Sequence, residues 1–208
     1  MSAEAALESP VDGVGFVSAE PALGTDGGAM SFDQYLQRNQ KAILKEWFQA
    51  VVQTYPEETA RFLKKERDPF TNPVGSSILE GIEGIFMQIL GGLTSDEVLP
   101  FLDRIVRVRA VQDFTPAQAV AFMFALKDVV RSQTDKDGLT AQYAADLVGF
   151  ERTVDRAALM AFNIYMECRE KLYQLRVDEI KNRTGRLLER ANALWESRRK
   201  EDGSEEES

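Results

Sequence analysis

Two pairs of acidic residues have the spacing that carboxylate chemistry on a helix would need. Glu80 and Glu83 are three residues apart, and Glu151 and Asp155 are four residues apart, so each pair shares one helix face. Such carboxylates ligate iron in di-iron bundles, but those sites also need a Glu-x-x-His motif, and this chain contains no histidine. Because acidic side chains are rarely buried, we interpret both pairs as solvated helix faces and predict no metal site.

Cys168 is the only cysteine, which limits the chemistry of its thiol. One thiol cannot form an intrachain disulfide, hold an iron–sulfur cluster alone or supply a structural zinc site. A redox-sensing role is one hypothesis, but the flanking Glu167 and Arg169 have opposite charges, so a small packed side chain is favoured. The absence of histidine also excludes a Ser–His or Cys–His pair and a His-ligated haem. We therefore predict no catalytic residue, no cofactor and no enzymatic activity.

Two further groups of side chains have types that suit ligand binding. One contains Arg104, Arg107 and Arg109 with Asp113, which could hold an anion, although a polar face with local ion pairs is the simpler interpretation. The other is a set of phenylalanines that could line a small-molecule pocket: Phe86, Phe101, Phe114, Phe122 and Phe124. Core filling is the default role of such residues, so the pocket is the less favoured hypothesis.

The charge of the chain lies in its two ends. Residues 1–31 and residues 201–208 each carry five acids and no Lys or Arg. Removing −5 and −5 from the net charge of −9 leaves +1 for residues 32–200. We therefore predict disordered acidic tails at 1–31 and 201–208 around one nearly neutral domain, whose charge gives no support for binding to nucleic acid.

Signals for export and membrane insertion are not visible in the sequence. The first 37 residues contain no Lys, no Arg and no apolar segment of the kind that a secretion signal needs. The most apolar run, from Gly84 to Leu93, is about half as long as a membrane span. A chain without disulfides fits a reducing compartment. We predict a cytoplasmic protein without direct membrane insertion.

Apolar residues recur at helical spacing along most of the chain, and no stretch shows a convincing strand pattern. The pattern predicts an all-α fold of five or six helices, at about 32–54, 56–65, 74–90, from 94 onward, 115–132 and within 140–199. Thr115, Pro116 and Gln118 give the clearest helix start, because they supply an N-cap hydroxyl, a first-turn proline and a capping-box glutamine. Gly81 and Gly84 each cost roughly 1 kcal/mol of helix propensity relative to Ala, so we expect a close helix crossing there.

The last helix has two halves with different apolar patterns. A broad stripe predicts packing on the domain and consists of Leu159, Phe162, Ile164, Tyr165, Cys168, Leu172 and Leu175. From Tyr173 onward the spacing alternates between three and four residues, as in a coiled-coil seam. This seam consists of Tyr173, Val177, Ile180, Leu187, Ala191 and Leu194, with Thr184 as a polar interruption. We assign residues 32–175 to the domain and residues 176–200 to a projecting helix that serves a dimer or a partner.

Four stretches are distinctive when they are taken together. They are YPEETARFL at 55–63, NPVG at 72–75, RVRAVQDFTPAQAVAF at 107–122 and IYMECREKLY at 164–173. They resemble the N-terminal domain of the RsbR- and RsbD-type RsbT co-antagonists, which is the sensor half of bacterial stressosome proteins. The similarity covers about residues 36–192. The resemblance implies a globin-like helical fold that carries no haem, and a homodimer.

In that family the last sensor helix leads into a phosphorylatable STAS domain that binds a switch kinase. Here a mostly acidic tail follows Arg199 and no STAS domain is seen, so kinase sequestration and phosphorylation are not carried over. Stand-alone copies of the domain occur in anaerobic sulfate-reducing bacteria near genes for membrane redox complexes. We therefore expect a non-enzymatic sensory or regulatory protein that binds a signalling protein. The alternative is an adaptor or assembly factor that binds a subunit of an anaerobic redox membrane complex.

Overall fold

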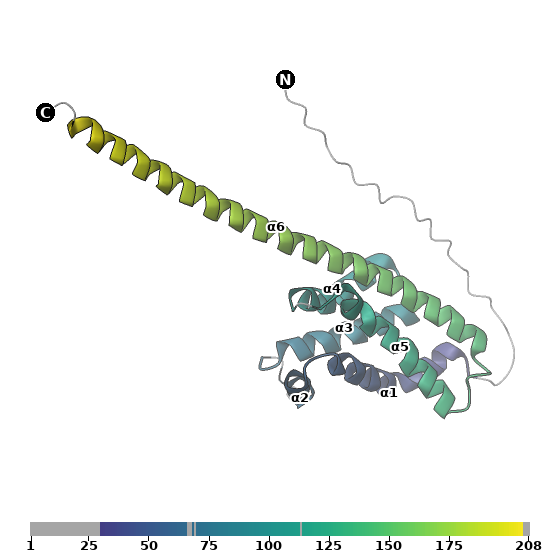
Figure 1. The fold of residues 1–208 in the computed structure, drawn as a ribbon. Coiled ribbons are helices and arrows are strands. Elements are labelled where there is room, and N and C mark those ends of the chain that lie inside the picture. The colour runs from purple at the N-terminus through teal and green to yellow at the C-terminus, as the bar shows by residue number, and fades with distance from the viewer. Residues whose placement is uncertain (1–29, 66–67, 69, 113, 206–208) are drawn as a thin grey trace, which may run out of the picture. The chain divides into compact units, whose positions relative to one another are not determined.

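Six helices make up the fold in the computed structural model, which describes residues 30–65, 68, 70–112 and 114–205. They are α1 (Phe32–Gln53), α2 (Glu57–Lys65), α3 (Pro73–Leu90), α4 (Ser95–Val111), α5 (Pro116–Lys136) and α6 (Ala144–Glu205). All six belong to one compact unit, residues 31–208 (Figure 1). The described residues contain no strand, so the prediction of an all-α fold with a long C-terminal helix is confirmed.

The two predicted acidic tails have different outcomes. Residues 1–29 of the first tail lie outside the described residues, and Ser31 is already the N-cap of α1. Helix α6 continues to Glu205, which is five residues into the segment 201–208 that we predicted to be disordered. Residues 206–208 lie outside the part that the structure describes.

Short local signals set the helix starts. The Ser31 side chain accepts a hydrogen bond from the Gln34 N–H, and the Gln34 side chain accepts one from the Ser31 N–H, which completes a capping box. Thr115 and Gln118 form the same box ahead of α5, as the sequence predicted. At α3 the Asn72 side chain accepts from the backbone N–H of Gly75 at 2.8 Å. These caps satisfy N–H groups that have no partner within the helix.

Helices α3 and α4 cross closely at two glycines, as predicted. A Cβ atom on Gly84 would lie 2.1–2.4 Å from three atoms of the Phe101 ring. A Cβ atom on Gly81 would lie 2.7 Å from Cγ1 of Ile105 and 3.1 Å from the backbone oxygen of Phe101. The missing side chains therefore let α4 approach α3, and this close contact compensates for the low helix propensity of glycine.

Trp47 anchors α1 to α5 in the centre of the bundle. Its side chain is fully buried, and its Nε1–H donates to the carbonyl oxygen of Phe122 at 2.6 Å. The rings of Trp47 and Phe122 are stacked, with their centroids 6.3 Å apart. The buried indole therefore satisfies its one donor while its ring fills the core.

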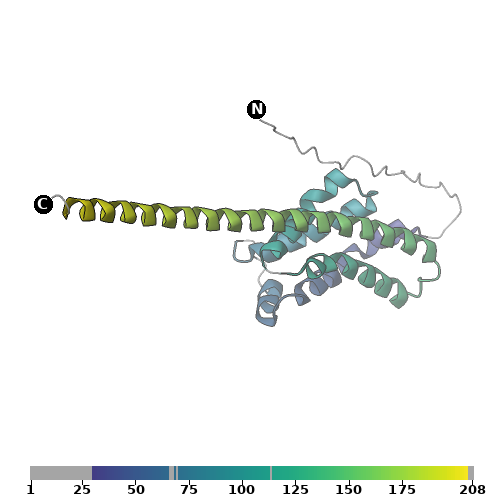
Figure 2. The same cartoon turned by 45° about the horizontal axis from the view of Figure 1, so that its top comes forward.

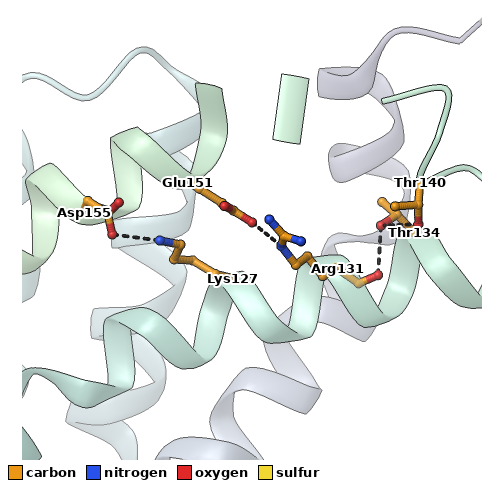
Figure 3. Close-up of polar contacts among 6 residues, drawn as sticks. All are labelled: Lys127, Arg131, Thr134, Thr140, Glu151 and Asp155. Atoms are coloured by element: carbon orange, nitrogen blue, oxygen red, sulfur yellow. Dashed lines mark hydrogen bonds and ion pairs between the residues drawn. The ribbon is translucent and has the colours of Figure 1, made fainter. Parts of the chain in front are cut away.

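The first part of α6 lies across α4 and α5, as the two views in Figures 1 and 2 show. Two ion pairs attach it to α5 (Figure 3): Nζ of Lys127 is 2.9 Å from Oδ1 of Asp155, and Arg131 pairs with Glu151. These pairs fix the position of α6 along α5 before the helix runs past the rest of the bundle.

Candidate functional site

Helix α6 passes from a buried environment to an exposed one. Its buried residues recur at helical spacing: Leu147, Phe150, Val154, Ala157, Ala158, Ala161, Ile164, Tyr165 and Cys168. From Arg169 to Trp195, none of the described residues of α6 is buried. The packed half of the helix therefore ends near Cys168, seven residues before the boundary that we predicted at residue 175.

The predicted packing stripe of α6 was wrong at three positions. Leu159 and Leu175 are 68% and 66% exposed, and Phe162 is exposed as well. The buried face instead contains Ala157, Ala158 and Ala161, because small side chains let α6 lie close to the helices beneath it. Ile164 and Tyr165 share this buried face, whereas Leu159, Phe162 and Leu175 lie outside it.

The exposed half of α6 presents the predicted apolar seam, which we call the α6 seam (Tyr173, Val177, Ile180, Leu187, Ala191 and Leu194). Its large members are between 43% and 65% exposed. Leu188 and Trp195 are also exposed and extend the apolar surface beside the seam. Extended exposed apolar surfaces are typical of interaction sites, so the α6 seam is a candidate binding surface.

Sequence reasoning missed two residues that continue the seam towards the bundle. Leu159 and Met166 lie 14 and 7 residues before Tyr173, and both are exposed. The signal was available, because an apolar residue recurs every seventh position from Leu159 to Leu194. The exposed strip therefore runs along the outer face of the packed half as well.

Arg109 occupies the interior of the bundle and not the polar surface that we predicted for it. Its guanidinium carbon lies 5.0–5.4 Å from the ring centroids of Tyr55, Phe114 and Phe122, and the residue is fully buried. Its spacing is consistent with burial, since Arg109 lies seven residues after the buried Leu102 in the same stripe of α4, but its charge favoured a surface position in the prediction.

Oxygen acceptors and aromatic rings surround the Arg109 charge in place of an acid. Arg109 donates to the carbonyl oxygens of Gln118 at 3.0 Å and Val51 at 3.3 Å, and to Oγ1 of Thr54 at 3.0 Å. No carboxylate among the described residues pairs with it. Burial lowers the pKa of the guanidinium, but an arginine remains charged in proteins. We call this arrangement the Arg109 junction, since it joins the end of α1, the end of α4 and the start of α5.

Two hydrogen bonds connect the Arg109 junction to α6. The Tyr165 hydroxyl donates to the carbonyl oxygen of Phe114 at 2.5 Å. Arg169 donates to the carbonyl oxygen of Ala110 at 3.1 Å. Both donors lie in the last turns of the packed half, directly before the α6 seam. A change of geometry at the junction is therefore positioned to move the root of the exposed half.

The family model of the RsbT co-antagonist protein rsbRD N-terminal domain matches residues 41–180, which is more than half of the chain. The chain belongs to this family. RsbRD-type domains have a regulatory sensor role. The part of this chain that matches the family model ends at Ile180, within the α6 seam. No curated protein and no solved structure matches the chain.

Within this RsbRD-type domain, the five phenylalanines predicted to line a pocket occupy different surroundings. Phe86 and Phe122 are buried, Phe101 fills the space at the α3–α4 crossing, and Phe114 lies over Arg109. Phe124 is exposed, because it lies two residues after Phe122 and so on the opposite side of α5. The structure therefore separates Phe124 from the other four, and the pocket stays a prediction.

A groove of about 640 Å³ opens elsewhere on the RsbRD-type domain, between α1, α2 and α3. Its lining includes Lys41, Lys45 and Lys64 above the apolar Leu44 and Leu63. None of the five phenylalanines lines it.

Cys168 lies at the boundary between the two halves of α6. The residue is buried, and this burial raises the pKa of its thiol while the charge of Arg107 acts in the opposite direction. A raised pKa reduces the thiolate population, which is the reactive form. These surroundings favour the packed role for Cys168, and the redox role stays a prediction.

Three of the four carboxylates considered from the sequence, Glu80, Glu151 and Asp155, interact with basic residues. Glu80 pairs with Arg104, and Glu151 and Asp155 make the ion pairs with α5 described above. Arg107 pairs with Asp103, so Arg104 and Arg107 do form the predicted local ion pairs, whereas Asp113 lies outside the described residues. Over the described ranges, no group of three or more His, Cys, Asp and Glu side chains is placed to hold a metal ion.

Proposed function

We propose that this RsbRD-type protein is a non-enzymatic sensory or regulatory protein whose output is a protein–protein contact made by the α6 seam. The observation that carries the proposal is the continuity of α6, which is packed in the bundle up to Cys168 and exposes apolar residues beyond Tyr173. A rigid helix shared by a core and a binding surface is a means of transmitting small displacements between them.

The Arg109 junction supports this proposal because it lies between the bundle core and the root of the seam. A buried charge without a paired acid is costly, so its hydrogen bonds and ring contacts must be kept or replaced together when the core rearranges. Tyr165 and Arg169 attach α6 to the backbone of Phe114, whose ring lies over this charge, and of Ala110, the residue after Arg109. A signal that alters the packing near Arg109 would therefore reach α6 directly.

Affinity capture from a native lysate tests the proposed output. The wild-type chain is compared with an Ile180→Asp/Leu187→Asp variant, which adds two charges to the seam. The matched control is Asn182→Asp/Asn192→Asp, which adds the same charges to exposed positions of α6 outside the seam. We expect wild type and control to recover the same partner and the seam variant to lose it. Recovery of that partner by all three proteins would contradict the proposal.

The identity of the captured proteins separates the proposed regulator from the alternative. Signalling proteins are expected for a sensory or regulatory role, whereas subunits of a redox membrane complex would indicate an adaptor or assembly factor. Among the described residues, no helix is both long enough and apolar enough to cross a membrane. We propose that the protein meets either partner from the cytoplasm.

A homodimer is also part of the proposal, on the strength of the family resemblance. Light scattering across micromolar concentrations should then give the mass of two chains. A mass equal to one chain over that range would contradict the dimer and leave the capture experiment unaffected.

A further inference from the structure

The charges beside the α6 seam carry information about its occupant. In heptad notation the exposed apolar residues occupy the d positions: Leu159, Met166, Tyr173, Ile180, Leu187 and Leu194. The a positions of the seam are Val177, Thr184 and Ala191. The flanking g positions are then Arg176, Arg183 and Arg190, and the flanking e positions are Gln174, Lys181, Leu188 and Trp195. Every g position beside the seam is therefore an arginine.

These three arginines are available for an intermolecular contact. Arg176, Arg183 and Arg190 are exposed, and none of them forms an ion pair within the part of the chain that the structure describes. The acids of this region, Asp178, Glu179 and Glu189, occupy b, c and f positions outside the seam, and Glu179 lies one turn from Arg176 and Arg183 without an ion pair to either. One edge of the seam is consequently lined by arginines that no ion pair among the described residues occupies.

A second copy of the chain does not complement this edge. In a parallel coiled coil, each g residue faces the e residue five positions later on the partner helix. Arg176 would face Lys181 of the second copy, and Arg183 and Arg190 would face uncharged Leu188 and Trp195. In an antiparallel pair, g positions face g positions, so arginine would face arginine. Neither orientation brings opposite charges together.

We infer that the α6 seam binds an amphipathic helix of a different protein, with Asp or Glu in the positions that flank its apolar stripe. This inference rests on the proposed function of the seam as a protein-binding surface and specifies the chemistry of the partner. Acidic flanks would pair with Arg176, Arg183 and Arg190, whereas a second copy would supply no opposite charge to them. The expected homodimer then uses a different surface.

The e side of the seam supplies a second element of recognition. Leu188 and Trp195 widen the apolar face towards the C-terminal end, and both are more than half exposed. Tryptophan and arginine are the residue types most enriched among side chains that dominate binding energy. The partner helix therefore has apolar residues opposite Leu188 and Trp195. Its acidic residues lie along the edge that faces the arginines of the g positions.

The test uses the full chain and two synthetic helical peptides of about four heptads, both with Ile at a and Leu at d. One peptide has Glu at all e and g positions, and the other has Lys there. Binding is measured by titration calorimetry at low and high salt. We expect the wild-type chain to bind the Glu peptide at least tenfold more tightly than the Lys peptide, with an affinity that falls as salt rises. Equal affinities, or no binding of the Glu peptide, would overturn the inference.

The charge-reversal variant Arg176→Glu/Arg183→Glu/Arg190→Glu sharpens the test. It should keep the thermal midpoint of the wild type, since these residues make no ion pair among the described residues, and it should prefer the Lys peptide. An unchanged preference for the Glu peptide would also overturn the inference.

The same variants separate this inference from the proposed function. If the Ile180→Asp/Leu187→Asp variant loses the lysate partner while the charge-reversal variant keeps it, the seam binds a protein and its arginines do not select it. If both variants lose the partner, the proposed function and the inference are both supported. If neither does, the seam is not the output surface and both fail.

Discussion

The two halves of α6 use apolar residues for different purposes. Up to Cys168 the buried face includes three alanines, and the helix is held by ion pairs, by the Tyr165 hydroxyl and by Arg169. Beyond Tyr173 the apolar residues of the seam, from Val177 to Leu194, are exposed, and none of them is buried by the bundle. Large apolar residues therefore occur in both halves, and contact with α4 and α5, not hydrophobicity, distinguishes the face that packs in the domain from the face that stays exposed.

The largest contrast is expected from placing one acid in each half. Val154→Asp buries a carboxylate at a fully buried position and should lower the free energy of unfolding by about 4 kcal/mol or more. Ile180→Asp changes an exposed residue and should leave the unfolding transition within about 0.5 kcal/mol of wild type. Urea denaturation followed by circular dichroism measures both. Equal losses would mean that the exposed half also contributes to the core.

A pair of arginine truncations compares the two halves through charge. Arg109→Ala removes three ring contacts and three hydrogen bonds and leaves a cavity, so we expect a loss of about 3 kcal/mol. Arg183→Ala removes an exposed side chain and should cost less than about 0.5 kcal/mol. The same denaturation curves provide the readout. A neutral Arg109→Ala would show that the Arg109 junction does not hold the bundle together.

Two glycine substitutions test the close packing of the bundle against the open surroundings of the exposed half. Gly84→Leu forces a side chain into the Phe101 ring and should cost about 1–3 kcal/mol by overpacking. A Cβ on Gly185 meets no atom within 4 Å, so Gly185→Leu should be neutral or stabilise the helix by less than about 1 kcal/mol. Thermal midpoints of the two variants give the comparison. If Gly84→Leu melts with the wild type, α3 and α4 do not require the close crossing.

The smallest effect is expected at the surface of the packed half. The hydrogen bond from Arg131, with its charge, holds the pKa of the Glu151 carboxyl below its ordinary value. A depressed pKa stabilises the fold at pH above the unfolded-state pKa, and this contribution disappears as pH falls through the folded-state pKa. Glu151→Gln should therefore lower Tm at pH 7 by no more than about 2 °C and match wild type in acid. A pH series of thermal melts checks both points, and a gap that persisted in acid would exclude the ion pair as its cause.

Features encoded over a few neighbouring residues were predictable from the sequence. The capping box at Thr115 and Gln118 and the close crossing at Gly84 depend on spacing within one segment, whereas the binding role of the seam from Tyr173 stays a prediction. The position of Arg109 was not predictable, because its surroundings come from the end of α1 and the start of α5, which meet only in the folded chain. Local pattern placed it in an apolar stripe, but its charge pointed to the surface.

The sequence predicted that α6 has a packed half and an exposed half, but it did not predict the residue at which the packed half ends. The change from a broad stripe to a narrow one was visible, but Leu159, Phe162 and Leu175 were assigned to the core because they are large and apolar. In the folded chain, the face of α6 that contacts α4 and α5 includes Ala157, Ala158 and Ala161. The hydrophobicity of the residues within α6 alone does not predict which face makes these contacts.

The length of α6 beyond its last buried residue gives the protein mechanical leverage. At a rise of about 1.5 Å per residue, the helix from Tyr173 to Glu205 is about 50 Å long. From Cys168 the distance to the far end is about 55 Å, so a tilt of about 5° there would move that end by about 5 Å, while atoms at the pivot shift by a fraction of that distance. A rotation of α6 that is too small to break the hydrogen bond between Tyr165 and Phe114 would thus move the C-terminal end of the helix by a distance comparable to the width of a side chain.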